Sequence, residues 1–292
     1  MRLFRISLSG VILCGILAAA SPAQADPFSF TVFDCPGATN TYAFGISHSG
    51  YVVGFCADAS RRSHGFVRST RGAFVTIDPP DAINDSLAYG VYTLGQIVGT
   101  FEDANAKHHG YLLKTPDAFT TFDAPGASDT WAYGINAAGQ IVGRFVEAGG
   151  KTHGFVRSVG GKLSTIDISG AISTEVLGIN SAGQIVGDFE DAGGKQHGYV
   201  RSARGAFTNI DMPGALSTEA WGINAAGRVS GLFTDAGHKV HGFVRSAGGV
   251  FTTIDVPNAT GTYAHGINDA GQIVGHFFDS SGKAHGFVTR RR

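Results

Sequence analysis

The sequence predicts an all-β protein, a six-bladed β-propeller with four antiparallel strands in each blade. Three observations predict it. A repeat recurs six times at spacings of 44 or 45 residues, marked by His-Gly pairs that begin at His64, His109, His153, His197, His241 and His285. Each repeat contains four short strand-like runs, the pattern of one propeller blade. The chain also begins with the last strand of a repeat and ends with the first three.

The four strands are clearest in the third copy, where we expect them at residues 131–136, 140–147, 153–158 and 163–167. Turn residues (Gly, Asn, Asp and Ser) separate them, as a series of hairpins requires. The first hairpin turn is Asn136-Ala137-Ala138-Gly139. Its glycine recurs in all six copies and suits a type I turn that closes with a positive φ angle.

The two ends of the chain predict a closed ring. Residues 30–34 form a fourth strand with no preceding three, and residues 285–288 form a third strand with no fourth after it. Pairing these ends completes a sixth blade and removes the exposed faces of an open stack. The fourth strand is then outermost and the strand rich in Ala and Gly is innermost.

Within the innermost strand we expect small side chains to face the axis, at Ala43, Ala88, Ala132, Ala220 and Ala264, with Val176 as the exception. The alternate face carries larger groups, which we expect to fill the wedge between blades. These are Phe44, Tyr89, Tyr133, Leu177, Trp221 and His265.

The first 25 residues predict a secretory signal peptide. Arg2 and Arg5 precede an apolar run over 6–20, and Ala23-Gln24-Ala25 supplies a cleavage site near Ala25. The run is too short for a comfortable membrane span. The sequence thus predicts a secreted protein, extracellular or periplasmic, whose propeller occupies residues 26–292.

Cys35 and Cys56 are the cysteines left after cleavage. In an exported chain they can form a disulfide. Other copies fill both positions with apolar residues, mostly Phe in the case of Cys56. Two buried thiols acting as small hydrophobic groups are therefore an equal alternative.

Composition and motifs exclude several functions. Loss of Arg2 and Arg5 with the signal peptide lowers the formal net charge from -1 to -3, which is unsuited to nucleic acid. The sequence has no Gly-rich phosphate loop, no His-Glu-x-x-His and no G-x-S-x-G motif. We expect no cofactor, no metal and a monomer.

The repeated His and Asp residues predict a structural role, because every blade has them and chemistry needs a site only once. A strand-end Asp accepts turn N–H groups, and a His ring can join strands. The hairpin 191–195, with its acid and Lys, predicts a solvated ion pair instead of a Ca²⁺ site. The six Asp residues are Asp34, Asp78, Asp123, Asp167, Asp211 and Asp255.

Function is expected where the copies differ. The position three before the inner-strand Gly holds Tyr42, Leu87, Trp131, Glu175, Glu219 and Tyr263. We expect these residues around one mouth of the central channel, where aromatic rings and carboxylates suit a sugar. The alternatives are ordinary packing between blades, and a carboxylate pair for glycoside hydrolysis at Glu175 and Glu219.

The pattern G-I-N-x-A-G-Q-I-V-G, found best at 134–143, 178–187 and 266–275 with a His-Gly pair beyond each, resembles the extracellular HAF repeat family of bacterial secreted proteins. The resemblance covers residues 28–288. All six copies have Gly after His where the family usually has Ala, and Ser47 and Tyr92 replace the Asn. The resemblance implies a repeat fold and export, and carries no common activity.

These observations favour a secreted, non-enzymatic propeller that binds a glycan or a protein of the cell envelope. One alternative is a glycan-acting enzyme, a hydrolase or lyase, that uses Glu175 and Glu219. The other is a purely structural envelope protein.

Overall fold

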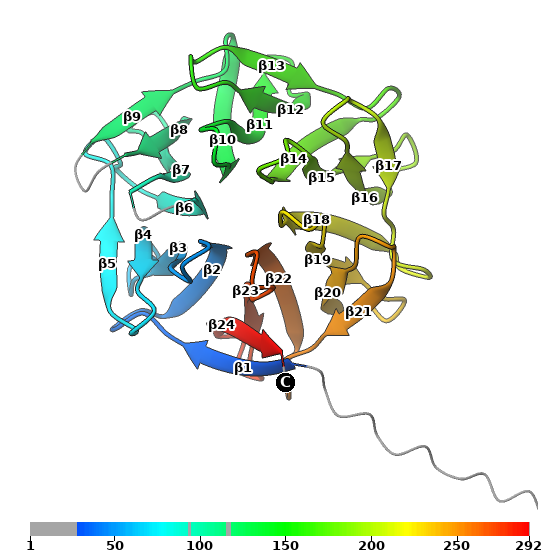
Figure 1. The fold of residues 1–292 in the computed structure, drawn as a ribbon. Helices are drawn as coiled ribbons and strands as arrows, with labels where there is room; N and C mark the ends of the chain where they lie inside the picture. The colour runs from blue at the N-terminus through cyan, green and yellow to red at the C-terminus, as the bar shows by residue number, and fades with distance from the viewer. Residues whose placement is uncertain (1–27, 93–94, 115–117, 292) are drawn as a thin grey trace, which may run out of the picture.

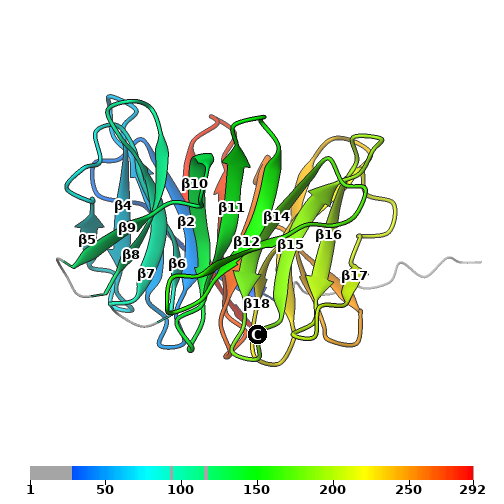
Figure 2. The ribbon, with the colours of Figure 1, turned by 90° about the horizontal axis from the view of Figure 1, so that it is seen from above.

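A computed structural model describes residues 28–92, 95–114 and 118–291; the predicted signal peptide lies outside them. Within these residues 24 strands form six four-stranded antiparallel sheets. The sheets surround a central axis like blades (Figure 1). Seen from above, the strands run between two faces that carry the hairpins and links (Figure 2). The prediction of a six-bladed β-propeller is confirmed.

Blades are numbered in ring order, and each runs from an inner to an outer strand. Blade 1 comprises β2 (Asn40–Ile46), β3 (Val52–Ala57), β4 (Ser63–Arg68) and β5 (Phe74–Ile77). Blade 2 comprises β6 (Ser86–Val91), β7 (Ile97–Glu102), β8 (His108–Leu113) and β9 (Phe119–Phe122). Blade 3 comprises β10 (Ala127–Ile135), β11 (Ile141–Glu147), β12 (Thr152–Arg157) and β13 (Leu163–Ile166). Blade 4 comprises β14 (Ser173–Ile179), β15 (Ile185–Glu190), β16 (Gln196–Arg201) and β17 (Phe207–Asn209). Blade 5 comprises β18 (Ser217–Ile223), β19 (Val229–Thr234), β20 (Val240–Arg245) and β21 (Phe251–Ile254).

Blade 6 closes the ring with strands from both ends of the chain. It comprises β22 (Gly261–Ile267), β23 (Ile273–Phe278), β24 (Ala284–Arg291) and, outermost, β1 (Phe28–Phe33). β1 pairs antiparallel with β24 from Phe28 opposite Arg291 to Phe33 opposite Gly286, and the two strands lie side by side in Figure 1. The expected closure is confirmed.

A disulfide joins Cys35 and Cys56, whose Cα atoms are 6.3 Å apart. Of the two alternatives that the sequence left open, the structure thus has the bonded pair. Cys35 follows the closing strand β1, and Cys56 lies in β3 of blade 1. The bond therefore ties the link that leaves blade 6 to the neighbouring blade.

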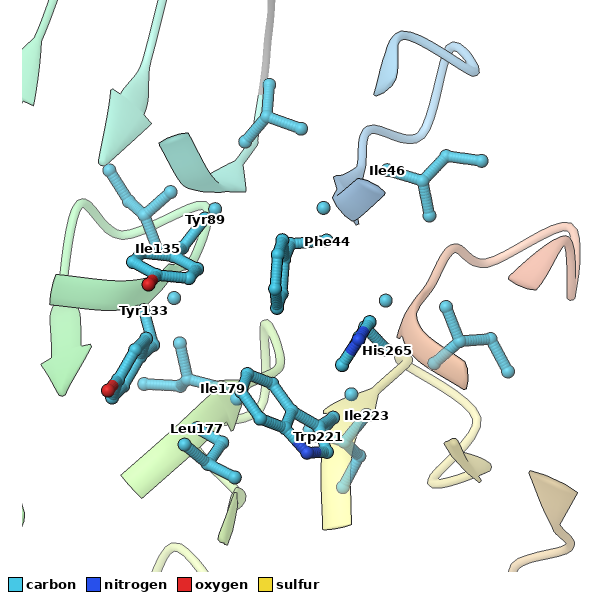
Figure 3. A pocket seen from close by; sticks show the side chains of 18 residues that line it. Phe44, Ile46, Tyr89, Tyr133, Ile135, Leu177, Ile179, Trp221, Ile223 and His265 are labelled. Atoms are coloured by element: carbon cyan, nitrogen blue, oxygen red, sulfur yellow. The ribbon is translucent and has the colours of Figure 1, made fainter. Parts of the chain in front are cut away.

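The expected orientation of the innermost strands is wrong. Ala43 and its equivalents are fully buried (0% exposed), whereas Phe44 and its equivalents line a hollow on the axis and turn toward it in Figure 3. The reason is the glycine that follows. A Cβ at Gly45 would lie 2.5 Å from the carbonyl oxygen of Tyr89 in the next blade, so glycine lets adjacent inner strands approach closely. The narrow wedge then holds Ala in five blades and Val176 in blade 4, all fully buried, and the larger side chains fill the axis.

The Asn of the G-I-N motif joins neighbouring blades. The Oδ1 atom of Asn180 accepts the N–H groups of Ala182 and Gln184 in its own hairpin, and its Nδ2 donates to the carbonyl of Asn224 in the next blade at 3.1 Å. The same inter-blade bond runs from Asn136, Asn224 and Asn268. Ser47 of blade 1 keeps the hairpin bond, from the N–H of Tyr51, but a serine has no amide to donate to the next blade.

Removal of the disulfide is predicted to weaken closure. In the Cys35→Ala/Cys56→Ala variant the free energy of unfolding should fall by about 3 kcal/mol, because the unfolded chain regains the freedom of a 21-residue separation. Urea unfolding of the oxidised protein and the variant measures this. Equal stability would show that β1 pairing alone holds the ring.

Loss of one inter-blade amide is predicted to be mild. Asn180→Ser should keep the hairpin bond, as Ser47 does, and lose the bond to Asn224. The free energy of unfolding should fall by about 1 kcal/mol. Asn180→Ala, which loses both, should cost more. If the two variants unfold at the same urea concentration, the inter-blade bond contributes nothing measurable.

Candidate functional site

Two variable positions of the repeat face each other at one end of the axis. Each residue that the sequence analysis singled out in the inner strand pairs directly with one residue of the second strand. The inner strands run in the same sense in all six blades, so these pairs gather at the same end. We call these twelve residues the variable mouth: Tyr42 with Phe55, Leu87 with Thr100, Trp131 with Arg144, Glu175 with Asp188, Glu219 with Leu232, and Tyr263 with His276.

A layer of large side chains forms the floor of the mouth. Phe44 stacks on His265 with ring centroids 4.3 Å apart and meets Tyr89 edge-on at 4.9 Å. Trp221 contacts both His265 and Tyr133. A hollow of about 90 Å³ on the axis is lined by these side chains and by the Gly and the Ile or Val that follow each of them. The rings and Leu177 surround this hollow in Figure 3. The hollow has room only for a few waters.

One side of the mouth carries charge. The guanidinium of Arg144 lies 4.3 Å above the Trp131 ring, and its Nη1 is 2.6 Å from Oε1 of Glu175 in the next blade. His108 of the preceding blade stacks on the same indole at 4.8 Å. Trp131 thus holds Arg144 in place, and its ring already has partners from within the protein.

Two further carboxyl groups adjoin Glu175. Asp188 is only 4% exposed and accepts a hydrogen bond from Nε2 of Gln196 at 2.7 Å. Burial, together with Glu175 and Glu219, raises its pKa well above the ordinary value. Burial also raises the pKa of Glu219, opposed by the Trp221 N–H that donates to it at 2.9 Å and reinforced by Glu175. The cluster favours protonated carboxyl groups beside one ion pair.

The other side of the mouth is aromatic. Tyr263 stacks on His276 at 4.7 Å with nearly parallel rings, and Tyr42 meets His276 edge-on at 5.0 Å. Burial lowers the pKa of His276 to about 3, so this imidazole is neutral at neutral pH. Nδ1 of His276 lies 3.3 Å from Nε2 of His265 in the floor.

The structure therefore brings all five predicted binding residues, Tyr42, Trp131, Glu175, Glu219 and Tyr263, to one mouth. Each is partly exposed. Sequence reasoning missed Arg144, Asp188 and His276. They occupy the position directly after the recurrent second-strand Gly, and this position varies between copies as strongly as the inner-strand position does.

The repeated His residues lie on the third strand of each blade, between two acids of that blade. In blade 4, Nδ1 of His197 is 2.8 Å from Asp211 and its Nε2 is 3.1 Å from Asp191. The strand-end Asp residues thus contact the imidazole, and the expected turn N–H groups go to the hairpin acids instead, as at Asp191. Lys107 and Lys283 also pair with strand-end Asp residues, not with the acid of their own hairpin as expected.

The described residues contain no group of three or more His, Cys, Asp or Glu side chains placed to hold a metal ion. Nor do they include a helix long and apolar enough to cross a membrane.

The chain resembles solved propellers in fold. No family model and no curated protein matches it. AofleA from Arthrobotrys oligospora is 11% identical with a TM-score of 0.57, over 90% of this chain and 86% of that chain. A variant of the Aleuria aurantia lectin in complex with α-methyl-L-fucoside is 10% identical with a TM-score of 0.51, over 90% and 91%. TolB from Acinetobacter baumannii is 11% identical with a TM-score of 0.56, over 83% and 64%. At these identities the likeness shows the fold alone.

The buried carboxyl of Asp188 is predicted to make stability depend on pH. Its pKa is higher in the folded protein than in the unfolded chain, so the folded state retains a proton and stability falls as pH rises above about 4. Asp188→Asn removes this loss and should be more stable than the parent at pH 8, with the difference vanishing near pH 3. Urea unfolding across this range measures it.

Asp81→Asn, at an exposed position, is the matched control and should show no such trend. An Asp188→Asn variant that is less stable at pH 8 than at pH 3, relative to the parent, would contradict the assignment of a buried protonated carboxyl.

Proposed function

We propose that the protein is a carbohydrate-binding propeller whose ligand sits on the variable mouth. The observation that carries the proposal is the cluster of Arg144, Glu175 and Glu219 beside Trp131 and Tyr263. All five lie where the six copies differ, while the residues that build the ring are repeated. A ring that needs only identical blades gains nothing from these differences, whereas a ligand site does.

The chemistry of the mouth suits a neutral ligand with many hydroxyl groups. Arg144 neutralises Glu175 in a 2.6 Å ion pair, and the raised pKa values of Asp188 and Glu219 favour their uncharged forms. Little net charge is therefore left to attract a strongly ionic ligand. The same groups supply many hydrogen-bond donors and acceptors to hydroxyl groups.

The aromatic residues of the mouth would not bind a sugar by simple stacking of their ring faces, because protein groups already contact these faces. The Tyr263 ring is parallel to His276, and the Trp131 ring contacts Arg144 and His108. A sugar at this mouth would meet ring edges and apolar C–H groups, with its specificity set by the carboxyl and guanidinium groups.

The resemblance in fold supports the class of ligand. Among the solved propellers of similar fold is a lectin bound to α-methyl-L-fucoside. We further propose that the chain is exported by the leader at residues 1–25, which would bring the mouth to extracellular or envelope glycans. A protein partner of the envelope remains the other ligand that we infer from the sequence.

A glycan panel tests the proposal. Ligands that bind only the folded state raise the unfolding midpoint, by about 2.7 kcal/mol of stability at a hundredfold excess over Kd. At least one glycan should do so, and Glu175→Gln should weaken its binding roughly 10-fold or more, the usual value of a hydrogen bond to a charged group.

Glu147→Gln is the control, since Glu147 lies on an outer hairpin beside His153 and should leave binding unchanged. A glycan whose binding is equally insensitive to Glu175→Gln would contradict the site. If the protein instead releases shortened glycan during the assay, and Glu175→Gln abolishes this release, the protein is the glycan-acting enzyme that the sequence analysis gave as an alternative.

A further inference from the structure

Blade 1 lacks a ring that the other five blades share. In each of those blades a second-strand Phe stacks on the repeated His, with centroids 5.1 to 5.3 Å apart. These pairs are Phe101 with His109, Phe145 with His153, Phe189 with His197, Phe233 with His241, and Phe277 with His285. In blade 1 the residue opposite His64 is Cys56, which is tied into the disulfide.

The missing ring leaves His64 uncovered. Its side chain is 32% exposed, against 12 to 18% for the five other repeated His residues. Its Nδ1 remains fixed 2.8 Å from Asp78, as in the other blades. The imidazole is therefore held by the strand-end acid as in the other blades, but without a Phe stacked on it.

A hollow of about 410 Å³ opens at this place. One wall is apolar and consists of the disulfide with Phe66 and Phe74, whose rings are 5.3 Å apart. The other wall carries His64, Asp58 and Asp78. This volume lies within the usual range for small-molecule sites, and an apolar lining with a few polar groups is their usual composition.

We propose that this hollow is a second binding site, separate from the variable mouth, and that it takes a small planar aromatic molecule bearing an N–H or O–H donor. The aromatic part follows from the five other blades, which show that the fold seats a ring on this imidazole. The guest ring replaces the absent Phe, stacks on His64 and packs against Phe66 and Phe74.

The donor follows from Asp58. Its Oδ2 is 3.5 Å from Nε2 of His64, a longer and weaker contact than the 3.1 Å between Asp191 and His197. Its side chain is 41% exposed at the rim of the hollow. This oxygen is thus placed to accept an N–H or O–H from a ring that lies on the imidazole.

Indole and phenol are suitable probes, with cyclohexanol as the non-planar control. Titration of each probe into the protein, followed through the ring-proton signals of His64 by NMR, should give a saturable shift for indole and phenol only. Cys35→Ala/Cys56→Phe restores the missing ring and should weaken indole binding at least 10-fold. Cys35→Ala/Cys56→Ala also loses the disulfide part of the wall but adds no ring opposite His64, and should bind indole within about threefold of the parent.

Asp58→Asn gives a second test that leaves both cysteines in place. It should weaken phenol and indole about 10-fold and leave toluene, which has no donor, unaffected. The proposal is overturned if indole binds equally well to Cys35→Ala/Cys56→Phe, if cyclohexanol binds as tightly as phenol, or if no probe gives a saturable shift up to about 10 mM.

Discussion

The pairing of β1 with β24 is the contact on which the ring depends. It brings residues more than 250 positions apart into one sheet, so every other blade can form from local hairpins while the sixth cannot. The closing strand contributes Phe28, which is 1% exposed and packs with Phe287 of blade 6 and Ile254 of blade 5 in the core between these two blades. The disulfide that follows β1 secures the same junction from the side of blade 1. Without closure the innermost strands of blades 6 and 1 would no longer pack against each other. The layer of large side chains on the axis would then be incomplete.

Closure also explains how the chain divides its residues between structure and function. Contacts between blades repeat: glycine lies where inner strands approach, and Asn amides bind the carbonyl of the next blade. Within each blade, the repeated His lies between two acids. Because these positions stabilise the fold, it does not depend on the side chains at the mouth. The mouth can therefore hold an ion pair, buried carboxyl groups and stacked rings in different blades without disturbing the ring.

The sequence was sufficient for the architecture because the repeat and its split are periodic properties. It also predicted that Trp131, Glu175 and Glu219 lie at the same end of the axis, because equivalent positions in the six blades lie at the same level along the axis. It failed for the direction of Ala43 and Phe44, since alternation along a strand does not say which face turns to the axis. Close approach at Gly45 decides that, and it is a property of two neighbouring blades. Arg144 and Asp188 were missed for a similar reason, as their pairing with the inner strand exists only in the folded sheet.

The central claim is that the residues that differ between copies bind the ligand while the repeated ones hold the ring. Backbone hydrogen exchange, with and without the glycan that stabilises the protein most, tests it directly. The account predicts slower exchange in the inner and second strands of blades 3 to 5 around Trp131, Arg144, Glu175 and Glu219, with little change at the repeated His-Gly strands. Protection confined to the outer strands, or to the opposite end of the axis at Asn136 and Asn180, would contradict it.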